Sequence, residues 1–174
     1  IATQHGIACE HLDYVQIHPT GLASPQPGRT FLISESCRGE GAVLLNQAGE
    51  RFTDELQPRD VVAAAIRSQM KKDGSDHEWL SFAPVPRDVI CGHFANIRAR
   101  CLEDGRDIAD EPIPVVPTQH YFMGGIWVNR DSATSMPGLY AAGETSCNGV
   151  HGKNRLASNS LLESLVFARR AAYS

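Results

Sequence analysis

Four cationic or titratable side chains lie beside glycine, proline or small polar residues and outside any amphipathic run. They are His18, Arg59, His120 and Arg155. A guanidinium is a fixed cation whose fork matches a carboxylate, and an imidazole donates a hydrogen bond and can carry a proton. Two arginines and two histidines that converge on one small site would hold a dicarboxylate. Taken singly, each residue is more often structural than functional, as a satisfied buried histidine or a solvated arginine.

The segment 138–163 joins a short apolar strand, a Gly143-Glu144 corner and a helix start rich in serine and asparagine. An acidic side chain at the carboxyl end of a strand can bind a ribose or ribityl hydroxyl group. Backbone N–H groups at a helix start bind anionic or carbonyl oxygens. The segment is therefore a candidate nucleotide site. The alternative interpretation is that Glu144 is a turn residue and Ser158 an N-cap.

Several common motifs are absent from the sequence. Gly39-Glu40-Gly41 begins like a dinucleotide fingerprint, but Leu44 replaces the third glycine and no helix follows. Cys147 and His151 have the spacing of half a metal site, and no second ligand pair exists. The sequence therefore predicts no metal site, and the first half of a nucleotide site is missing.

Composition excludes several classes of protein. The chain has 174 residues, a net charge of -4 and 16 scattered lysines and arginines, so no nucleic-acid partner is expected. No apolar run approaches the roughly 20 residues of a membrane span. Five cysteines without a C-x-x-C pair indicate free thiols in a reducing cytoplasm. The first ten residues lack a signal-peptide pattern, and a start without Met suits an excised or processed piece.

The pattern of apolar residues predicts an α+β fold. Helices are expected at 58–72, 86–102 and 158–173, the last with an inward apolar stripe of Leu161, Leu162, Leu165 and Val166. Strands are expected at 11–18 (ended by Pro19), 42–45, 79–82 and 138–142, and at 119–129, where Gly124-Gly125 marks a bulge or a close backbone approach. Three prolines within 111–117 favour an extended crossover. Residues 20–117 read as a domain inserted between the flanks 1–19 and 118–174.

Six segments together resemble the flavoprotein family of succinate dehydrogenase, fumarate reductase and L-aspartate oxidase. They read HPTGL, ESCRGEGAVLLNQAGERF, PRDVVAAAI, EPIPVVPTQHYFMGGI, PGLYAAGE and HGKNRLASNSLLE, in this order over nearly the whole chain. The resemblance implies that 20–117 is the capping domain that closes over the substrate. It also implies that 1–19 and 118–174 belong to the C-terminal portion of a Rossmann-like FAD-binding domain, whose N-terminal part is absent here.

The resemblance also implies chemistry, namely hydride transfer between a C4 dicarboxylate (L-aspartate, succinate or fumarate) and flavin N5. Arg59 matches the family's proton-transferring arginine. The substrate-binding positions match His18, Ser34, Glu35, His120 and Arg155, and the flavin-contacting positions match Glu144, Ser160 and Leu161. FAD is expected in the whole protein and not on this piece alone.

Two segments, PRDVVAAAI and RLASNSLLE, together with the short link from Gly125 to Pro137, favour the oxidase branch of the family. EPIPVVPTQHY is closer to the respiratory branch, so a respiratory flavoprotein subunit remains an alternative. A stable, non-catalytic cap is a further alternative. Because the missing half would leave a surface uncovered, self-association of the piece is also expected.

Overall fold

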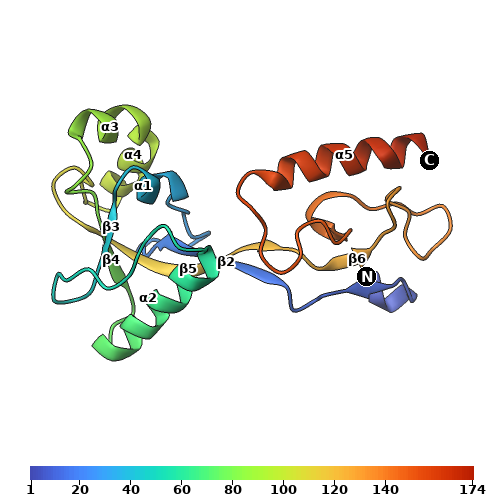
Figure 1. Cartoon of the computed structure of the whole chain (residues 1–174), viewed down its shortest axis with the longest axis horizontal. Coiled ribbons are helices and arrows are strands. Elements are labelled where there is room, and N and C mark those ends of the chain that lie inside the picture. The colour runs from blue at the N-terminus through green and yellow to red at the C-terminus, as the bar shows by residue number, and fades with distance from the viewer. The chain divides into compact units, whose positions relative to one another are not determined.

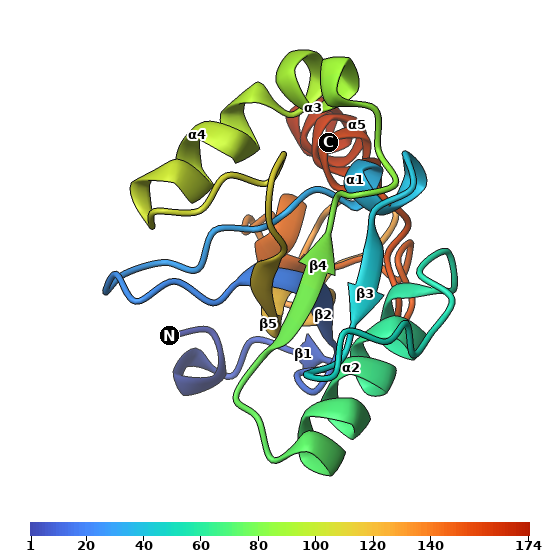
Figure 2. The ribbon, with the colours of Figure 1, turned by 90° about the vertical axis from the view of Figure 1, so that its left-hand side faces the viewer.

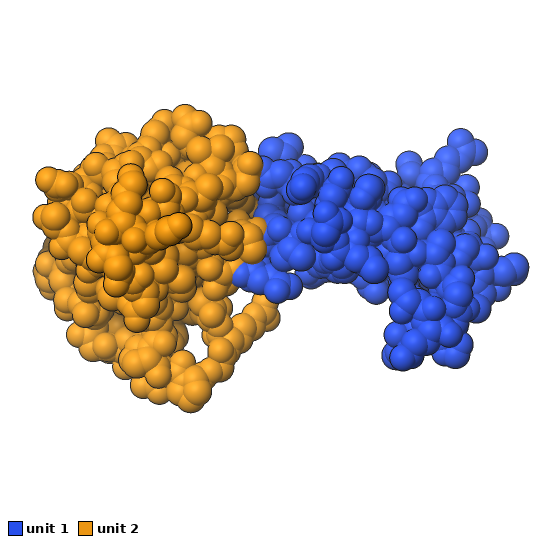
Figure 3. Space-filling model, turned by 90° about the horizontal axis from the view of Figure 1, so that it is seen from below, with its two compact units in different colours: residues 1–16, 119–174 blue, residues 17–118 orange.

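A computed structural model describes the whole chain, residues 1–174, and divides it into two compact units (Figure 3). Unit 1 comprises residues 1–16 and 119–174, and unit 2 comprises residues 17–118. The chain passes between the units twice, once within β2 (Val15–Leu22) and once within β5 (Ile113–Phe122). Helices and strands are mixed along the chain, as an α+β fold requires.

Unit 2 is built on a sheet with the strand order β2-β5-β4-β3. β3 (Val43–Leu45) and β4 (Glu78–Ser81) are antiparallel, and β4 is antiparallel to β5. The helices are α1 (Glu35–Gly39), α2 (Arg59–Asp73), α3 (Arg87–His93) and α4 (Ala95–Glu103). Figures 1 and 2 show the strands between α2 and the α3–α4 pair. All of these elements contribute to one apolar core, whose fully buried side chains include Ile33, Leu44, Val62, Ile66, Leu80 and Ile113.

The helix expected at 58–72 is confirmed as α2. Val62 and Ile66, one turn apart, are fully buried, and Gly74 ends the helix with a left-handed φ of 64°. Val61, next to Val62 in the apolar run of this helix, is 46% exposed. The buried face of α2 therefore consists of Val62, Ala63 and Ile66 and does not include Val61.

The single helix expected at 86–102 is wrong, because α3 ends at His93 and α4 begins at Ala95. Phe94 between them has φ -110° and ψ 20°, outside the helical range. Its ring is buried against Phe82, with ring centroids 6.1 Å apart. The helix breaks at the residue that makes this tertiary contact, whereas the apolar periodicity of 86–102 predicts one continuous helix.

The two expectations about prolines have different outcomes. Pro19 was expected to end a strand, but β2 continues through it to Leu22. β2 is an edge strand, where the missing N–H of proline removes no inner ladder bond. The extended backbone expected at 111–117 is confirmed, and most of this segment is strand β5, which contains Pro114 and Pro117. Proline and the residue before it both prefer an extended backbone, which a strand also requires.

Unit 1 has a smaller sheet, with strand order β1-β6-β7. β1 (Cys9–Glu10) is antiparallel to β6 (Gly125–Trp127), and β6 is parallel to β7 (Ser146–Cys147). Two 3-10 turns, η1 (Thr3–His5) and η2 (Gly143–Thr145), and helix α5 (Asn159–Tyr173) complete it. Segment 138–142 forms only the isolated bridge of Tyr140 with Ala133, so the strand expected there is wrong.

The close backbone approach expected at Gly124-Gly125 is confirmed. A Cβ atom on Gly124 would lie 1.9 Å from the backbone oxygen of His11. A Cβ on Gly125, whose φ is +141°, would lie 2.5 Å from the oxygen of Thr145. Only glycine fits at either position, because real side chains do not tolerate such distances.

Helix α5 does not bury the stripe that its sequence predicts. Leu161, Leu162 and Leu165 are 75%, 62% and 71% exposed, and the buried side chains are those of Glu163 and Phe167. The expectation of an inward leucine stripe is therefore wrong within this chain. No helix of the protein combines the length and the apolar character that crossing a membrane needs.

Candidate active site

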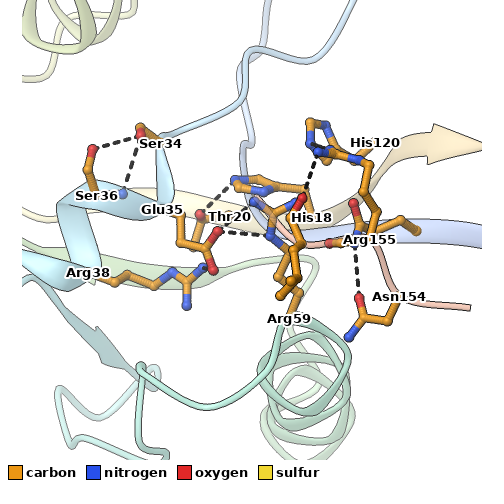
Figure 4. A network of polar contacts seen from close by, with 12 residues as sticks. His18, Thr20, Ser34, Glu35, Ser36, Arg38, Arg59, His120, Asn154 and Arg155 are labelled. Carbon is orange, nitrogen blue, oxygen red and sulfur yellow. Dashed lines mark hydrogen bonds and ion pairs between the residues drawn. The ribbon is translucent and has the colours of Figure 1, made fainter. Parts of the chain in front are cut away.

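His18 is fixed inside unit 2 on strand β2 (Figure 4). Its side chain is buried, and Nε2 lies 2.7 Å from the backbone oxygen of Ile33 and 3.2 Å from Oγ1 of Thr20. The Thr20 hydroxyl also donates to the Ile33 oxygen, at 3.1 Å. A carbonyl oxygen only accepts, so Nε2 carries the hydrogen. The orientation of the imidazole is thus set by the backbone.

Arg59 is the first residue of α2 and lies against a carboxylate of unit 2. Oε2 of Glu35 accepts from Nε at 2.9 Å and from Nη2 at 2.5 Å, and the Arg59 side chain is only 11% exposed (Figure 4). Two nitrogens on one carboxylate fix the plane of the guanidinium as well as its position. Arg59 is therefore a cation held in one orientation.

Glu35 also pairs with Arg38, whose Nη2 lies 3.6 Å from Oε1. Partial burial acts to raise the pKa of Glu35, but the hydrogen bond and charge of Arg59, with the charges of Arg38 and His18, outweigh it and lower the pKa. Burial lowers the pKa of Arg38, although Glu35 opposes that shift. Two guanidiniums share one carboxylate, so this cluster keeps a net positive charge that suits an anion.

Ser34 precedes this cluster as the N-cap of α1. Its Oγ accepts from the backbone N–H of Ser36 at 3.3 Å and lies 2.7 Å from the Ser36 hydroxyl. The side chain is exposed, next to Glu35 in the chain. A hydroxyl at this place can donate a hydrogen bond to an acidic ligand.

Arg155 and His120 form a second cationic group, within unit 1. Nη2 of Arg155 lies 2.9 Å from Nε2 of His120 (Figure 4), and Nη1 donates to the backbone oxygen of Leu156 at 3.2 Å. Arginine only donates, so Nε2 of His120 is the acceptor in this contact. Gln16 donates to the backbone oxygen of Arg155 at 2.7 Å and to Asn154 at 2.9 Å. The loop that carries Arg155 is therefore held by Gln16 at its backbone and by His120 at its side chain.

Residues that sequence reasoning missed complete both groups. Arg38 and Thr20 contribute to the group of unit 2, and Tyr121 and Gln16 to that of unit 1. The Arg155 guanidinium lies 4.5 Å from the centre of the Tyr121 ring. The adjacency of Tyr121 to His120 in the sequence was a usable signal, whereas nothing in the sequence links Gln16 to a loop 139 residues away.

The positions matched to flavin contacts also lie together in unit 1. Glu144 is exposed in η2, where Oε1 accepts from the backbone N–H of Phe122 at 2.9 Å. η2 packs closely on α5, since a Cβ on Gly143 would lie 3.1 Å from Oγ of Ser164. Ser160 and Leu161 are in the first turn of α5.

The start of α5 has no side-chain cap. Ser158 is the N-cap residue of α5, as the alternative interpretation expected, but it has φ 66° and its side chain makes no capping hydrogen bond. Uncapped N–H groups beside an exposed carboxylate match the oxygens and hydroxyls of a flavin nucleotide. The residues present in this unit thus fit FAD.

The profile of a family described as "FAD binding domain" matches residues 1–161. The L-aspartate oxidases of Clostridium perfringens and Clostridium acetobutylicum are 55% and 54% identical over 173 residues, 99% of this chain. The chain spans 39% and 40% of their lengths. Among solved structures, the quinol fumarate reductase of E. coli superposes with a TM-score of 0.84 at 34% identity, covering 98% of this chain and 33% of that one.

The profile match and the level of identity bear out the family resemblance read from the six segments. They also agree with the groups found in unit 1, where an uncapped helix start lies beside an exposed carboxylate. The chain belongs to the FAD binding domain family, together with the L-aspartate oxidases and the fumarate reductase flavoproteins.

Proposed function

We propose that this chain is part of an FAD-dependent L-aspartate oxidase. The whole enzyme would convert L-aspartate to iminosuccinate, with O2 or fumarate as electron acceptor, in NAD biosynthesis. The two clostridial L-aspartate oxidases are 54–55% identical to nearly all of the chain, against 34% for the fumarate reductase and 39–41% for a succinate dehydrogenase of Mycobacterium smegmatis. The oxidase is therefore favoured over a fumarate reductase or succinate dehydrogenase flavoprotein.

We further propose a division of labour along the chain. Residues 20–117 would form the capping domain that closes over the substrate. Residues 1–19 and 118–174 would belong to the C-terminal part of the FAD-binding domain. Unit 2 has its own apolar core, which supports a domain that moves as a body.

One observation carries the proposal, namely the guanidinium of Arg59 held on two nitrogens by Glu35. Oxidation of aspartate removes a hydride from Cα and a proton from the amine. FAD, when bound, supplies the acceptor for the hydride. Arg59 would carry the proton, and fixed orientation is what such a transfer needs.

The substrate carboxylates would be bound by His18, Ser34, His120 and Arg155. Each arginine group has a fixed cation, which suits a carboxylate. The resemblance also matches Glu35 to the substrate site. We propose that Glu35 acts there by holding Arg59 in place and does not itself contact the substrate. An ionised carboxylate repels a substrate carboxylate, and its neighbours keep Glu35 ionised.

FAD would be held in part by Glu144, Ser160 and Leu161. The remaining contacts would come from the part of the relatives' length that this chain does not span. The isolated chain is therefore expected to be inactive. Its five cysteines are free thiols, which suits the cytoplasm as its compartment.

The leucine stripe of α5 supports self-association of the isolated chain. Its side chains are apolar and 62–75% exposed at Leu161, Leu162 and Leu165. Covering such a stripe with a second copy would remove it from water.

A substrate panel tests the proposed function. The full-length protein, loaded with FAD, should produce hydrogen peroxide from L-aspartate and none from succinate. Turnover of succinate with an artificial electron acceptor and none of L-aspartate would favour the respiratory alternative. Absence of both activities in a protein that retains its flavin would favour a non-catalytic cap.

A further inference from the structure

We infer that Tyr121 is a positioning residue for substrate binding, because its ring orients the guanidinium of Arg155. The inference rests on the proposed function, in which Arg155 binds a substrate carboxylate. It adds a residue that neither the sequence motifs nor the family resemblance singled out.

The geometry around Arg155 supports this role. The guanidinium carbon lies 4.5 Å from the centre of the Tyr121 ring, within the range of a cation–π interaction. Both residues are buried, with 5% of Arg155 and 8% of Tyr121 exposed. Burial removes water that would weaken the attraction, so this pair is stronger than a surface pair. The ring face on one side, and the Leu156 oxygen and His120 on the edge, together restrict how the Arg155 guanidinium can turn.

The Tyr121 ring also contacts a second buried side chain, that of His151. His151 packs against it with ring centroids 5.7 Å apart and planes at 86°. Nε2 of His151 lies 3.9 Å from Oε2 of Glu163, and Asn148 donates a short hydrogen bond to the other oxygen of Glu163. A chain of buried side chains thus runs from α5 through His151 and Tyr121 to Arg155.

The ionisation of these groups agrees with a passive, aromatic role. Burial raises the pKa of Tyr121, with the charges of Glu163 and Glu144 adding to it, so the phenol stays neutral. Burial also lowers the pKa of His151, although Glu163 opposes the shift. Neither ring brings a positive charge against Arg155 at neutral pH.

Binding of a dicarboxylate separates positioning from simple core packing. The full-length, FAD-loaded protein is titrated with succinate, and the change in flavin absorbance gives the Kd. Tyr121→Phe keeps the ring face and should bind within about twofold of the wild type. Tyr121→Leu should bind about ten- to thirtyfold more weakly, with flavin content unchanged.

Two further variants guard against misfolding and general damage. Tyr121→Met fills the space without an aromatic face and should weaken binding as Tyr121→Leu does. Tyr140→Leu changes a partly exposed tyrosine of the same unit and should bind like the wild type. In steady state, the Tyr121→Leu defect should fall on KM for L-aspartate more than on kcat.

Each outcome bears on a different claim. Wild-type affinity in Tyr121→Leu or Tyr121→Met overturns the inference and leaves the proposed function standing. Loss of flavin from both variants also overturns it, because Tyr121 would then be structural. If the wild-type protein responds to neither succinate nor L-aspartate, the proposed function fails and the inference fails with it.

Discussion

Arg59 and Arg155 are held by different kinds of contact. Arg59 is bound on two nitrogens by a carboxylate, whereas Arg155 lies against an aromatic ring and contacts a histidine. A carboxylate partner neutralises part of the charge, and an aromatic face leaves the charge intact while fixing its plane. The first arrangement suits a group that exchanges protons, and the second suits a group that binds an anion.

Replacing Arg59 by Lys should remove turnover and keep the flavin. A lysine ammonium cannot present two nitrogens to Glu35, so the proton carrier loses its orientation. In the full-length protein, the kcat for L-aspartate should fall by about 10²–10⁴-fold. Flavin absorbance after gel filtration should be unchanged. Arg67→Lys, on the exposed side of the same helix, is the matched control, and normal turnover by Arg59→Lys would refute the role.

The ion pair of Glu35 with Arg59 predicts a pH dependence of stability. The folded-state pKa of Glu35 is lowered below its ordinary value of 4.5, so its stabilisation is present above pH 4.5 and is lost as pH falls through the lowered value. The side chain is 38% exposed, which limits the contribution to about 1 kcal/mol or less.

Urea unfolding of the chain and of Glu35→Gln can measure this difference. The wild type should be more stable at pH 7, and the gap should shrink steadily below pH 4.5. A gap that stays constant down to pH 3 would show that Glu35 acts by packing and not by charge.

At the scale of elements, helix starts and strand ends carry most of the site. Ser34 and Glu35 open α1, Arg59 opens α2, and Ser160 and Leu161 lie in the first turn of α5. Residues at a helix start are fixed by the helix behind them while their polar groups stay accessible. The packing of the helices therefore decides where the site residues lie.

Packing of α2 on the sheet should dominate the stability of unit 2. Ile66 is fully buried, so Ile66→Ala should lower the free energy of unfolding by about 2–5 kcal/mol. Val61→Ala, on the exposed face of the same helix, should change it by about 0.5 kcal/mol or less. Equal effects of the two substitutions in thermal or urea unfolding would contradict the burial of Ile66 and the exposure of Val61.

The backbone contact at Gly124 predicts a strong effect of one methyl group. Gly124→Ala must displace the backbone of His11, because its Cβ would lie 1.9 Å from that oxygen. The free energy of unfolding should fall by about 1–3 kcal/mol or more. Gly92→Ala is the control, since Gly92 lies in α3 with open space around it, and there alanine should be neutral or stabilising by up to about 1 kcal/mol. A tolerated Gly124→Ala would disprove the close approach.

At the scale of the whole molecule, the two units bury apolar residues very differently. The large apolar core lies entirely in unit 2, whereas unit 1 buries few large side chains and leaves the leucines of α5 in water. A domain without a sufficient core is marginally stable by itself. Unit 1 is therefore expected to need a partner surface, which the unspanned part of the relatives' length could supply.

The isolated chain should self-associate and bind no flavin. The double variant Leu161→Glu and Leu165→Glu should shift sedimentation toward the monomer, because charges on the stripe oppose its burial. Leu56→Glu with Leu102→Glu, at exposed leucines of unit 2, should leave the association unchanged. A monomeric wild-type chain at micromolar concentration, or a yellow flavin band in its absorbance spectrum, would contradict this expectation.

The sequence by itself determined the family, the mixed fold, the start and end of α2 and the need for glycine at 124 and 125. These features depend on local rules, namely amphipathic period, a left-handed helix end at Gly74 and the absence of a Cβ. The candidate cations were also visible, since each stands beside glycine, proline or small polar residues in a recognisable segment.

Only the tertiary structure decided which groups hold those cations and which faces are buried. The contact of Glu35 with Arg59 spans 24 positions and that of Gln16 with Arg155 spans 139, and no local pattern encodes either. The break at Phe94 and the inward turn of Glu163 on α5 likewise follow from packing against Phe82 and from a buried hydrogen bond with Asn148. Long-range packing selects among locally equivalent choices, because the free energy of burial depends on what each face meets.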